Sequence, residues 1–490
     1  MPLIQFGEYR PDVADYEGAS TQTILNVIPR GDGYGPFPGE SAYTGALPAA
    51  CRGAFYALKS DGSIVVFAGT STKLYKLNNT DYTWDDVSKG ASTYSTLSAD
   101  AQWRFAQTGN LVFATQANTV LQVFDLSSSS AFADAAGSPP QAAYIDIVGR
   151  FVVLSGLLSN PYRIQWSGLN DFNSSDSWTS GVNSSDYQDF PDGGIVRGVA
   201  GGEFGTIFQD QAIRRMTYVA GSPIVFQIDR ITQDKGLAAP LSVIRAGELI
   251  FFYSSHGFQK IAPGGLPEPI GRERVDRTFQ TDLDFGNLQF FIGASDPRST
   301  RVYWSYKSAN GAANLYDKII GYDYALDRFF PIEMSGEYLV GIAQTGLTLE
   351  SLDAISASLD DMTLTLDAYS TSSRPESAHF TSSHKLSFFR GSNLEATLDT
   401  PEQGTDGRRI YLNGFRPVTD AATAYGSLRY RESLSDTPTE TTEAAKSSRT
   451  GMCNLRKESR YARCRVRIPA ATSWTFCAGI EPAIKQTGLV

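Results

Sequence analysis

Arginine recurs at every second position near the end of this 490-residue chain. In YARCRVRI at 461–468, Arg463, Arg465 and Arg467 alternate with small or apolar residues, and Arg460 comes just before the run. Alternate side chains of a β-strand point to the same face, so the guanidinium groups would form a stripe. The stripe could face DNA phosphates or an acidic partner. The alternatives are a solvated outer face and ion pairs with carboxylates of an adjacent subunit.

Histidine and cysteine are too few and too scattered to predict a metal site. Two histidines lie five apart in a polar segment, and three cysteines are separated by 11 and 13 positions, which matches no zinc-ligand spacing. We therefore expect no metal and no His-based triad, and we expect the thiols to be buried and reduced. The histidines are His256, His379 and His384. The cysteines are Cys51, Cys453, Cys464 and Cys477.

Carboxylates are numerous, but no catalytic arrangement of them is recognisable. Sugar-cleaving propellers use a carboxylate pair, and their marker is a repeated Ser-x-Asp-x-Gly-x-x-Trp turn. KSDGSIVVF at 59–67 and NSSDSW at 173–178 are the nearest matches, and both miss it. No Gly-rich loop carries the Lys–Ser/Thr pair of a phosphate cradle. We expect no catalytic residue, no cofactor and no enzymatic activity.

A repeated strand pattern must position these residues. Five times an apolar run follows a glycine by two positions, and a further strand candidate comes next. Glycine takes the positive φ that a tight hairpin turn requires. The units recur roughly every 40 to 55 residues, a range typical of propeller blades. The glycines are Gly62, Gly109, Gly149, Gly205 and Gly247, and the third strand candidates lie at 73–78, 120–126, 162–167, 213–219 and 258–262.

Two later units extend the repeat. The sixth lacks the glycine but keeps the strand order, at 290–294, 301–306 and 318–324. A seventh begins with YLVGIAQT at 338–345 and is completed weakly by 352–359 and 362–370. Low charge density and many aromatic residues favour strands over long helices. The sequence therefore predicts an all-β fold with a six- or seven-bladed β-propeller over residues 51–370.

The flanking segments differ from the repeat. NVIPRGDGYGPFPG at 26–39 interleaves proline and glycine, which predicts an extended, irregular arm over 1–50 that lies on its own domain or on a neighbouring subunit. A polar, turn-rich linker is expected at 371–385. Further strand candidates follow, and they predict a β-sandwich-like C-terminal domain over 386–490.

Net charge narrows the class of partner. The formal charge is −10, which argues against tight, sequence-independent binding to nucleic acid but allows a surface along which DNA slides. No run approaches the roughly 18 apolar residues that span a membrane. The first residues resemble no secretory signal, so we expect synthesis and assembly in a cytoplasm and no membrane insertion.

Three stretches together resemble a family of virion proteins. They are the arm at 26–39, the unit VGRFVVLSGLLSNPYRIQWSGLNDFNSSDSW at 148–178, and DPRSTRVYWSYKS at 296–308 with KIIGYDYALDRFF at 318–330. The chain is similar to the packaged-DNA stabilisation proteins, also called tail accessory or nozzle proteins, of short-tailed bacteriophages. The ending with alternating arginines is also like that family's ending.

The resemblance implies a structural role in the virion tail, with assembly in the bacterial host cytoplasm. Members of the family form a ring, typically a hexamer, below the portal and adaptor rings. The ring extends the DNA channel, holds the packaged double-stranded DNA until genome ejection, and docks the distal tail tip or tailspikes. The alternative from another class is a carbohydrate-binding or carbohydrate-cleaving propeller, such as a receptor-binding tail protein. Aromatic and carboxylate side chains clustered at one mouth of the propeller would favour that alternative.

Overall fold

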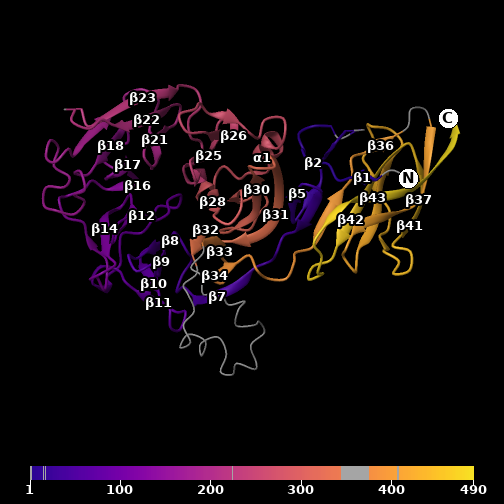
Figure 1. Cartoon of the computed structure of the whole chain (residues 1–490), viewed down its shortest axis with the longest axis horizontal. Coiled ribbons are helices and arrows are strands. Elements are labelled where there is room, and N and C mark those ends of the chain that lie inside the picture. Colours follow the sequence, from indigo (N-terminus) through magenta and orange to yellow (C-terminus); the bar gives the residue numbers. More distant parts are fainter. Residues whose placement is uncertain are drawn as a thin grey trace.

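Two all-β parts lie side by side in the computed structural model, which describes residues 3–14, 16, 18–222, 224–343, 375–404 and 408–489 (Figure 1). One part is a ring of four-stranded antiparallel sheets and the other is a two-sheet sandwich. The predicted fold class is thereby confirmed. Helix is scarce in the described ranges: α1 (Asp276–Asp282) and the 3-10 turns η1 (Lys89–Ala91), η2 (Pro240–Ser242) and η3 (Leu288–Phe290).

Seven sheets of the described ranges form the propeller, so the blade count is seven. Blade 1 contains β8 (Ala54–Leu58), β9 (Ile64–Gly69), β10 (Leu74–Leu77) and β11 (Trp84–Asp86). Blade 2 contains β12 (Arg104–Thr108), β13 (Leu111–Gln116), β14 (Thr119–Asp125) and β15 (Ala133–Asp134). Blade 3 contains β16 (Ala142–Val148), β17 (Phe151–Leu157), β18 (Arg163–Trp166) and β19 (Asp186–Asp189).

Blades 4 to 6 repeat the same meander. Blade 4 contains β20 (Val196–Ala200), β21 (Gly205–Gln209), β22 (Ile213–Tyr218) and β23 (Phe226–Thr232). Blade 5 contains β24 (Ile244–Ala246), β25 (Leu249–Ser254), β26 (Gly257–Ile261) and β27 (Glu268–Pro269). Blade 6 contains β28 (Ile292–Asp296), β29 (Arg301–Tyr306), β30 (Tyr316–Asp323) and β31 (Arg328–Gly336).

Blade 7 closes the ring and differs from the prediction. Its strands are β32 (Tyr338–Ala343), β33 (Pro375–Phe380), β34 (Lys385–Phe388) and, from the start of the chain, β7 (Ser41–Ala46). The expected strands at 352–359 and 362–370 lie outside the described residues. The expected linker at 371–385 contains β33 instead. Glu376, Ser377 and His379 are buried in this segment and Glu376 forms an ion pair with Arg390, so polarity there did not mark a linker.

The first strand of every blade lies nearest the centre of the ring. Each of these strands is paired on one side only, and β32 contacts β8 so that blade 7 meets blade 1 (Figure 1). Four of the five repeated glycines adopt the expected positive φ, with values of 83°, 54°, 56° and 63° at Gly62, Gly109, Gly149 and Gly247. Gly205 does not. A Cβ there would lie 3.0 Å from Val148, so close packing requires that glycine.

The sandwich combines both ends of the described chain. One sheet runs β41-β37-β43-β6-β5 with β1 also on β43, and the other runs β39-β38-β42-β35-β4 with β36 on β42 and β40 on β38. The first sheet's strands are β1 (Ile4–Gln5), β5 (Val27–Arg30), β6 (Gly33–Pro36), β37 (Arg408–Thr419), β41 (Cys453–Ser459) and β43 (Cys477–Leu489). The second sheet's are β4 (Ile24–Leu25), β35 (Ala396–Asp399), β36 (Gln403–Gly404), β38 (Tyr425–Arg431), β39 (Thr439–Glu440), β40 (Ala444–Ala445) and β42 (Tyr461–Ile468).

The N-terminal segment is extended and lies on its own chain's sandwich, but it forms regular strand pairs where an irregular arm was expected. β5 and β6 form an antiparallel hairpin within the proline- and glycine-rich stretch, and β6 pairs with β43. β2 (Glu8–Tyr9) and β3 (Ser20–Thr21) form a short parallel pair. Proline is tolerated because the hairpin is at the edge of the sheet, where donors need no ladder partner. Gly33 has φ 148° and a Cβ on it would lie 2.6 Å from the Cys477 carbonyl oxygen, so glycine permits the close approach to β43.

Candidate functional site

The predicted arginine stripe lies on β42, near the middle of one sandwich sheet. The inward face of this strand carries Cys464, Val466 and Ile468, which are all buried in the hydrophobic core, as the alternation predicted. The opposite face carries the arginines, between β38 and β35. We call this surface, with Arg463, Arg465 and Arg467 at its centre, the arginine face.

Arg465 is bound to a carboxylate whose position could not be predicted from the sequence. Its Nε and Nη2 donate to the two oxygens of Asp399 at 2.7 and 3.0 Å, and Asp399 lies directly across the β35–β42 ladder. Nη1 also lies 3.2 Å from Glu440. The Asp399 side chain is fully buried, and the hydrogen bonds to it raise the pKa of Arg465. A buried bidentate pair of this kind fixes the arginine in place.

Arg467 and Arg463 are also held by carboxylates of the same chain. Arg467 makes bonds of 2.7 and 2.6 Å to Glu443 and one of 2.8 Å to Glu395, which raise its pKa and lower that of Glu443. Arg463 is 5% exposed and its Nη2 lies 3.7 Å from Glu402. We expected these arginines to face DNA, solvent or another subunit, whereas their observed partners are carboxylates of the same chain.

Arg460 has a different environment from the other three. It lies in the short turn between β41 and β42 and is half-buried. In the described part of the chain it forms no ion pair with a carboxylate. Of the four predicted residues, Arg460 is therefore the one whose charge remains available. A role of the arginine face toward DNA or a subunit stays a prediction.

A second candidate site lies where the sandwich meets the propeller, and Asn26 is at its centre. Asn26 is buried and has φ 56°, between β4 and β5. Its backbone N–H donates to the Pro331 carbonyl at 3.1 Å, and its Oδ1 accepts from the Glu333 N–H at 2.8 Å, both on β31 of blade 6. Its Nδ2 donates to the Glu395 carbonyl at 2.9 Å, beside β35 of the sandwich. One side chain thus joins both domains.

Asp12 makes a second connection, to the N-terminus of α1. Its carboxylate accepts from the backbone N–H groups of Arg277 and Thr278, each at 2.8 Å, and from the Thr278 hydroxyl at 2.7 Å. The first N–H groups of a helix have no partner within the helix, and no side chain of its own N-cap residue caps α1. Asp12 supplies the missing cap from a segment more than two hundred residues earlier in the chain.

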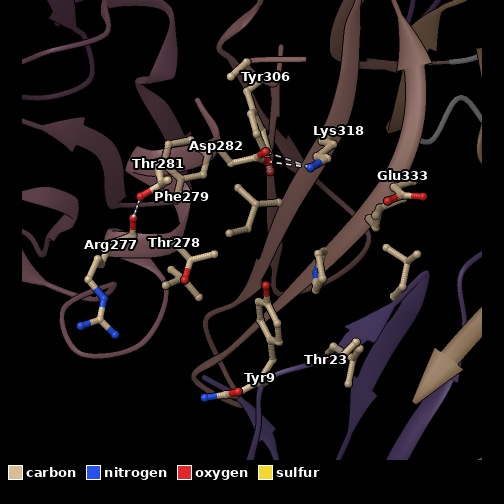
Figure 2. A pocket seen from close by; sticks show the side chains of 18 of the residues that line it. Tyr9, Thr23, Arg277, Thr278, Phe279, Thr281, Asp282, Tyr306, Lys318 and Glu333 are labelled. Atoms are coloured by element: carbon tan, nitrogen blue, oxygen red, sulfur yellow. Dashed lines mark hydrogen bonds and ion pairs between the residues drawn. The ribbon is translucent and has the colours of Figure 1, made fainter. Parts of the chain in front are cut away.

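A cavity of about 760 Å³ lies between these connections (Figure 2). Tyr9 and Thr23 of the N-terminal segment line one side, and residues of blade 6 line the other. On the blade side Lys318 donates to Asp282 at 2.8 and 3.1 Å, and the Tyr306 hydroxyl donates to the same carboxylate at 3.0 Å. Burial raises the pKa of Tyr306, so its hydroxyl stays protonated. Lys318, Tyr306 and Asp282 on the blade side of this cavity are thus occupied with one another.

Two of the histidines contact carboxylates within the fold, and all four cysteines lie in its interior. His379 is fully buried, 2.6 Å from the Tyr316 hydroxyl and 3.0 Å from Glu40, and His384 contacts Glu337 at 2.5 Å. All four cysteines are free and buried, as predicted, and burial raises the pKa of Cys453 to about 11. Among the described residues, no group of three or more His, Cys, Asp or Glu side chains is placed to hold a metal ion. Nor does any described helix have the length and apolarity to cross a membrane.

Comparison with known proteins adds no assignment of function. No family model and no curated protein matches the chain. Among solved structures, U3-55K covers 63% of this chain and 89% of its own at 9% identity, with a TM-score of 0.38. The extracellular domain of BT4673 from B. thetaiotaomicron covers 83% and 47% at 9% identity (TM-score 0.39), and YCF48 bound to D1 peptide covers 60% and 86% at 10% (0.36). At these scores the similarity supports no argument beyond the propeller ring already described.

Proposed function

We propose that this protein is a structural component of the tail of a short-tailed bacteriophage. In this role copies of the chain form a head-to-tail connector or nozzle ring that extends the DNA channel, retains packaged DNA and docks distal tail parts. The partners are other copies of the chain, the portal and adaptor rings, the distal tip or tailspikes and, transiently, double-stranded DNA. The proposal assigns no catalytic step, and it rests on the sequence resemblance together with the junction between the domains.

The construction of that junction is the observation that supports a structural role best. Domains of one chain usually move relative to one another unless their interface is extensive. Here residues 3–46 supply strands to both the sandwich and blade 7. Phe37, 1% exposed, packs against Tyr303 of blade 6 and against Phe389, with ring centroids 6.2 and 5.4 Å away. A single hydrophobic core therefore continues from one domain into the other.

A continuous core suits a part that transmits load. A hinge between the domains would let a ring of such subunits deform under the pressure of a packaged genome. The shared N-terminal segment removes that freedom, because moving one domain would break strand pairing in the other. Charge is consistent with the same role: a formal charge of −10 disfavours tight adhesion to DNA, which a channel must later release.

The direct test is assembly of the full-length chain. Light scattering, native mass spectrometry and negative-stain electron microscopy would be applied to the purified chain, alone and mixed with portal and adaptor rings. We expect closed rings in at least the mixed sample. A chain that stays monomeric both alone and beside those rings would refute the proposal.

Arg460 allows a sharper version of this test. Because its charge is unpaired within the described chain, Arg460→Glu should weaken contacts with another subunit without disturbing the fold. Arg150→Glu, at an exposed hairpin of blade 3, is the matched control. Rings lost in the Arg460 variant and kept in the Arg150 variant would place the arginine end of β42 at a subunit contact. A glycan panel tests the alternative class, since saturable glycan binding would favour a receptor-binding propeller.

A further inference from the structure

The centre of the propeller holds a narrow cavity that the proposed role does not use. It has a volume of about 220 Å³ and is lined by the first strands of most blades. Sites for drug-sized ligands usually have volumes of about 300–1,000 Å³. The occupant of this cavity would therefore be small. Because each lining strand is paired on one side only, its free edge faces the cavity with backbone polar groups.

The charged side chains in the lining are Arg104, Arg245 and Asp146. Asp146 is engaged by the backbone: its oxygens accept from the Ile147 and Gly201 N–H groups, each at 2.7 Å. Burial raises the pKa of Asp146, while these two hydrogen bonds and the charges of Arg245 and Arg104 act to lower it. The lining thus carries an excess of positive charge. It also holds a single carboxylate, whereas glycoside hydrolysis uses a pair.

Arg104 is the arginine that faces the cavity without forming an ion pair, although its charge acts on Asp146 across the cavity lining. Arg245 is exposed at the rim, where its guanidinium donates to the Gly201 and Gly247 carbonyls at 2.7 and 3.0 Å. Arg104 is half-buried on β12 and forms no ion pair with any carboxylate in the part of the chain that the structure describes. Its guanidinium lies within hydrogen-bonding reach of the Tyr338 hydroxyl and near that of Tyr144.

Together these groups form a recognition site for negative charge. A guanidinium presents a planar fork of N–H donors that fits carboxylate and phosphate oxygens. Tyrosine hydroxyls beside it can donate to the same oxygens, and the low dielectric of a narrow cavity strengthens each bond. We propose that the central cavity of the propeller binds a small oxyanion, a phosphate or a small carboxylate, at Arg104.

The position of the site gives binding a measurable consequence. Arg104 belongs to blade 2, Tyr144 to blade 3 and Tyr338 to blade 7, so a bound oxyanion would link blades across the seam where the ring closes. A ligand that binds the folded state alone stabilises it according to its concentration relative to Kd. Oxyanions should therefore raise the melting temperature of the full-length protein in a saturable way.

Titration calorimetry and thermal melts with inorganic phosphate, and separately with malonate, test the site and distinguish the two kinds of oxyanion. The variants are Arg104→Gln and, as a control with the same change of charge, Arg150→Gln in an exposed turn. We expect saturable binding of at least one probe to wild type and to the Arg150 variant. The Arg104 variant should bind at least tenfold more weakly, and its melting temperature should not respond to the probe.

Two results would overturn the proposal: saturable binding of neither probe, or equal responses in both variants, which would show a general salt effect. If Arg104→Gln fails to fold, wild-type crystals soaked in selenate decide the question. An anomalous peak beside the Arg104 guanidinium supports the site, and a cavity without one overturns it. Neither measurement depends on ring assembly, so this inference and the proposed function can fail separately.

Discussion

Replacing Asn26 by glycine should uncouple the two domains. The residue adopts φ 56°, so glycine preserves the backbone conformation while removing the side chain. The backbone bond to Pro331 remains, and the bonds to the Glu333 N–H and the Glu395 carbonyl are lost. These two groups belong to different domains. The substitution therefore acts on the junction rather than on either core.

The expected loss follows from the two orphaned groups. A neutral hydrogen bond contributes about 0.5–1.5 kcal/mol net, and leaving a buried partner unsatisfied costs about 1–3 kcal/mol. Asn26 is only 7% exposed, so water reaches the vacated positions poorly. Two such unsatisfied groups together give a destabilisation of roughly 2–6 kcal/mol.

Asn314→Gly is the matched control for this substitution. Asn314 has φ 64° and is exposed, and its side chain makes no hydrogen bond to the described residues. Both substitutions add the same freedom to the unfolded chain, worth about 0.4–1 kcal/mol. The difference between the two variants therefore isolates the side-chain bonds of Asn26.

Urea unfolding, differential scanning calorimetry and limited proteolysis together measure that difference. We expect wild type and Asn314→Gly to unfold in one transition, and Asn26→Gly to show a lower midpoint or two separate transitions with cleavage between the domains. The reasoning is refuted if the curves of the two variants coincide within about 0.5 kcal/mol, the range of ordinary surface substitutions.

Three further predictions address charge and topology. Burial raises the pKa of Asp276 to about 6, so the stability that this group contributes is present below about pH 4 and is lost as pH rises through 6. Asp276→Asn should remove that loss, which is about 2–3 kcal/mol at pH 7. Urea unfolding of wild type and of this variant from pH 4 to 7 checks the prediction, and an unfolding free energy that changes equally with pH in the two proteins would contradict it. Arg465→Gln removes the bidentate partner of the buried Asp399 carboxylate, which keeps only a 3.5 Å ion pair with Arg429, and should destabilise by about 3 kcal/mol. Arg460→Gln should stay within about 0.5 kcal/mol, as thermal melts can check. Deleting residues 1–46 removes strands from both domains and should abolish soluble expression; a soluble, cooperatively folded product would disprove the strand pairing.

Local pattern predicted most of the propeller. Apolar runs separated by turn-forming glycine locate the inner three strands of blades 1 to 5, because alternation and turn chemistry act over a few residues. The fourth, outer strand of each blade was harder to predict. Trp178, a large aromatic residue late in the third unit, lies in the loop between β18 and β19 and is buried there.

Long-range pairing could not be predicted in the same way. β7 joins β34 more than three hundred residues later, and neither strand carries a local signal for the other. The alternation on β42 correctly assigned its two faces, but the partner of Arg465 lies on β35 in an unremarkable stretch, ATLD. From the sequence, Asn26 was predicted to lie in an irregular arm, because its partners, β31 and the residue before β35, are distant in sequence. A single sequence therefore predicts which residues share a face of a strand, but not which strands or side chains pack against that face.

Sharing the N-terminal segment between domains also dictates when this protein can finish folding. While the ribosome is still translating, β6 must wait for β43, and β7 must wait for β34. Blades 1 to 6 can form as they emerge, but their nascent ring stays open at one seam, and the unpaired strand edges there are prone to aggregation. Newly made chains should therefore depend on chaperone protection until synthesis reaches β43, and a premature stop before that strand should yield insoluble product even though the strands of all seven blades precede it.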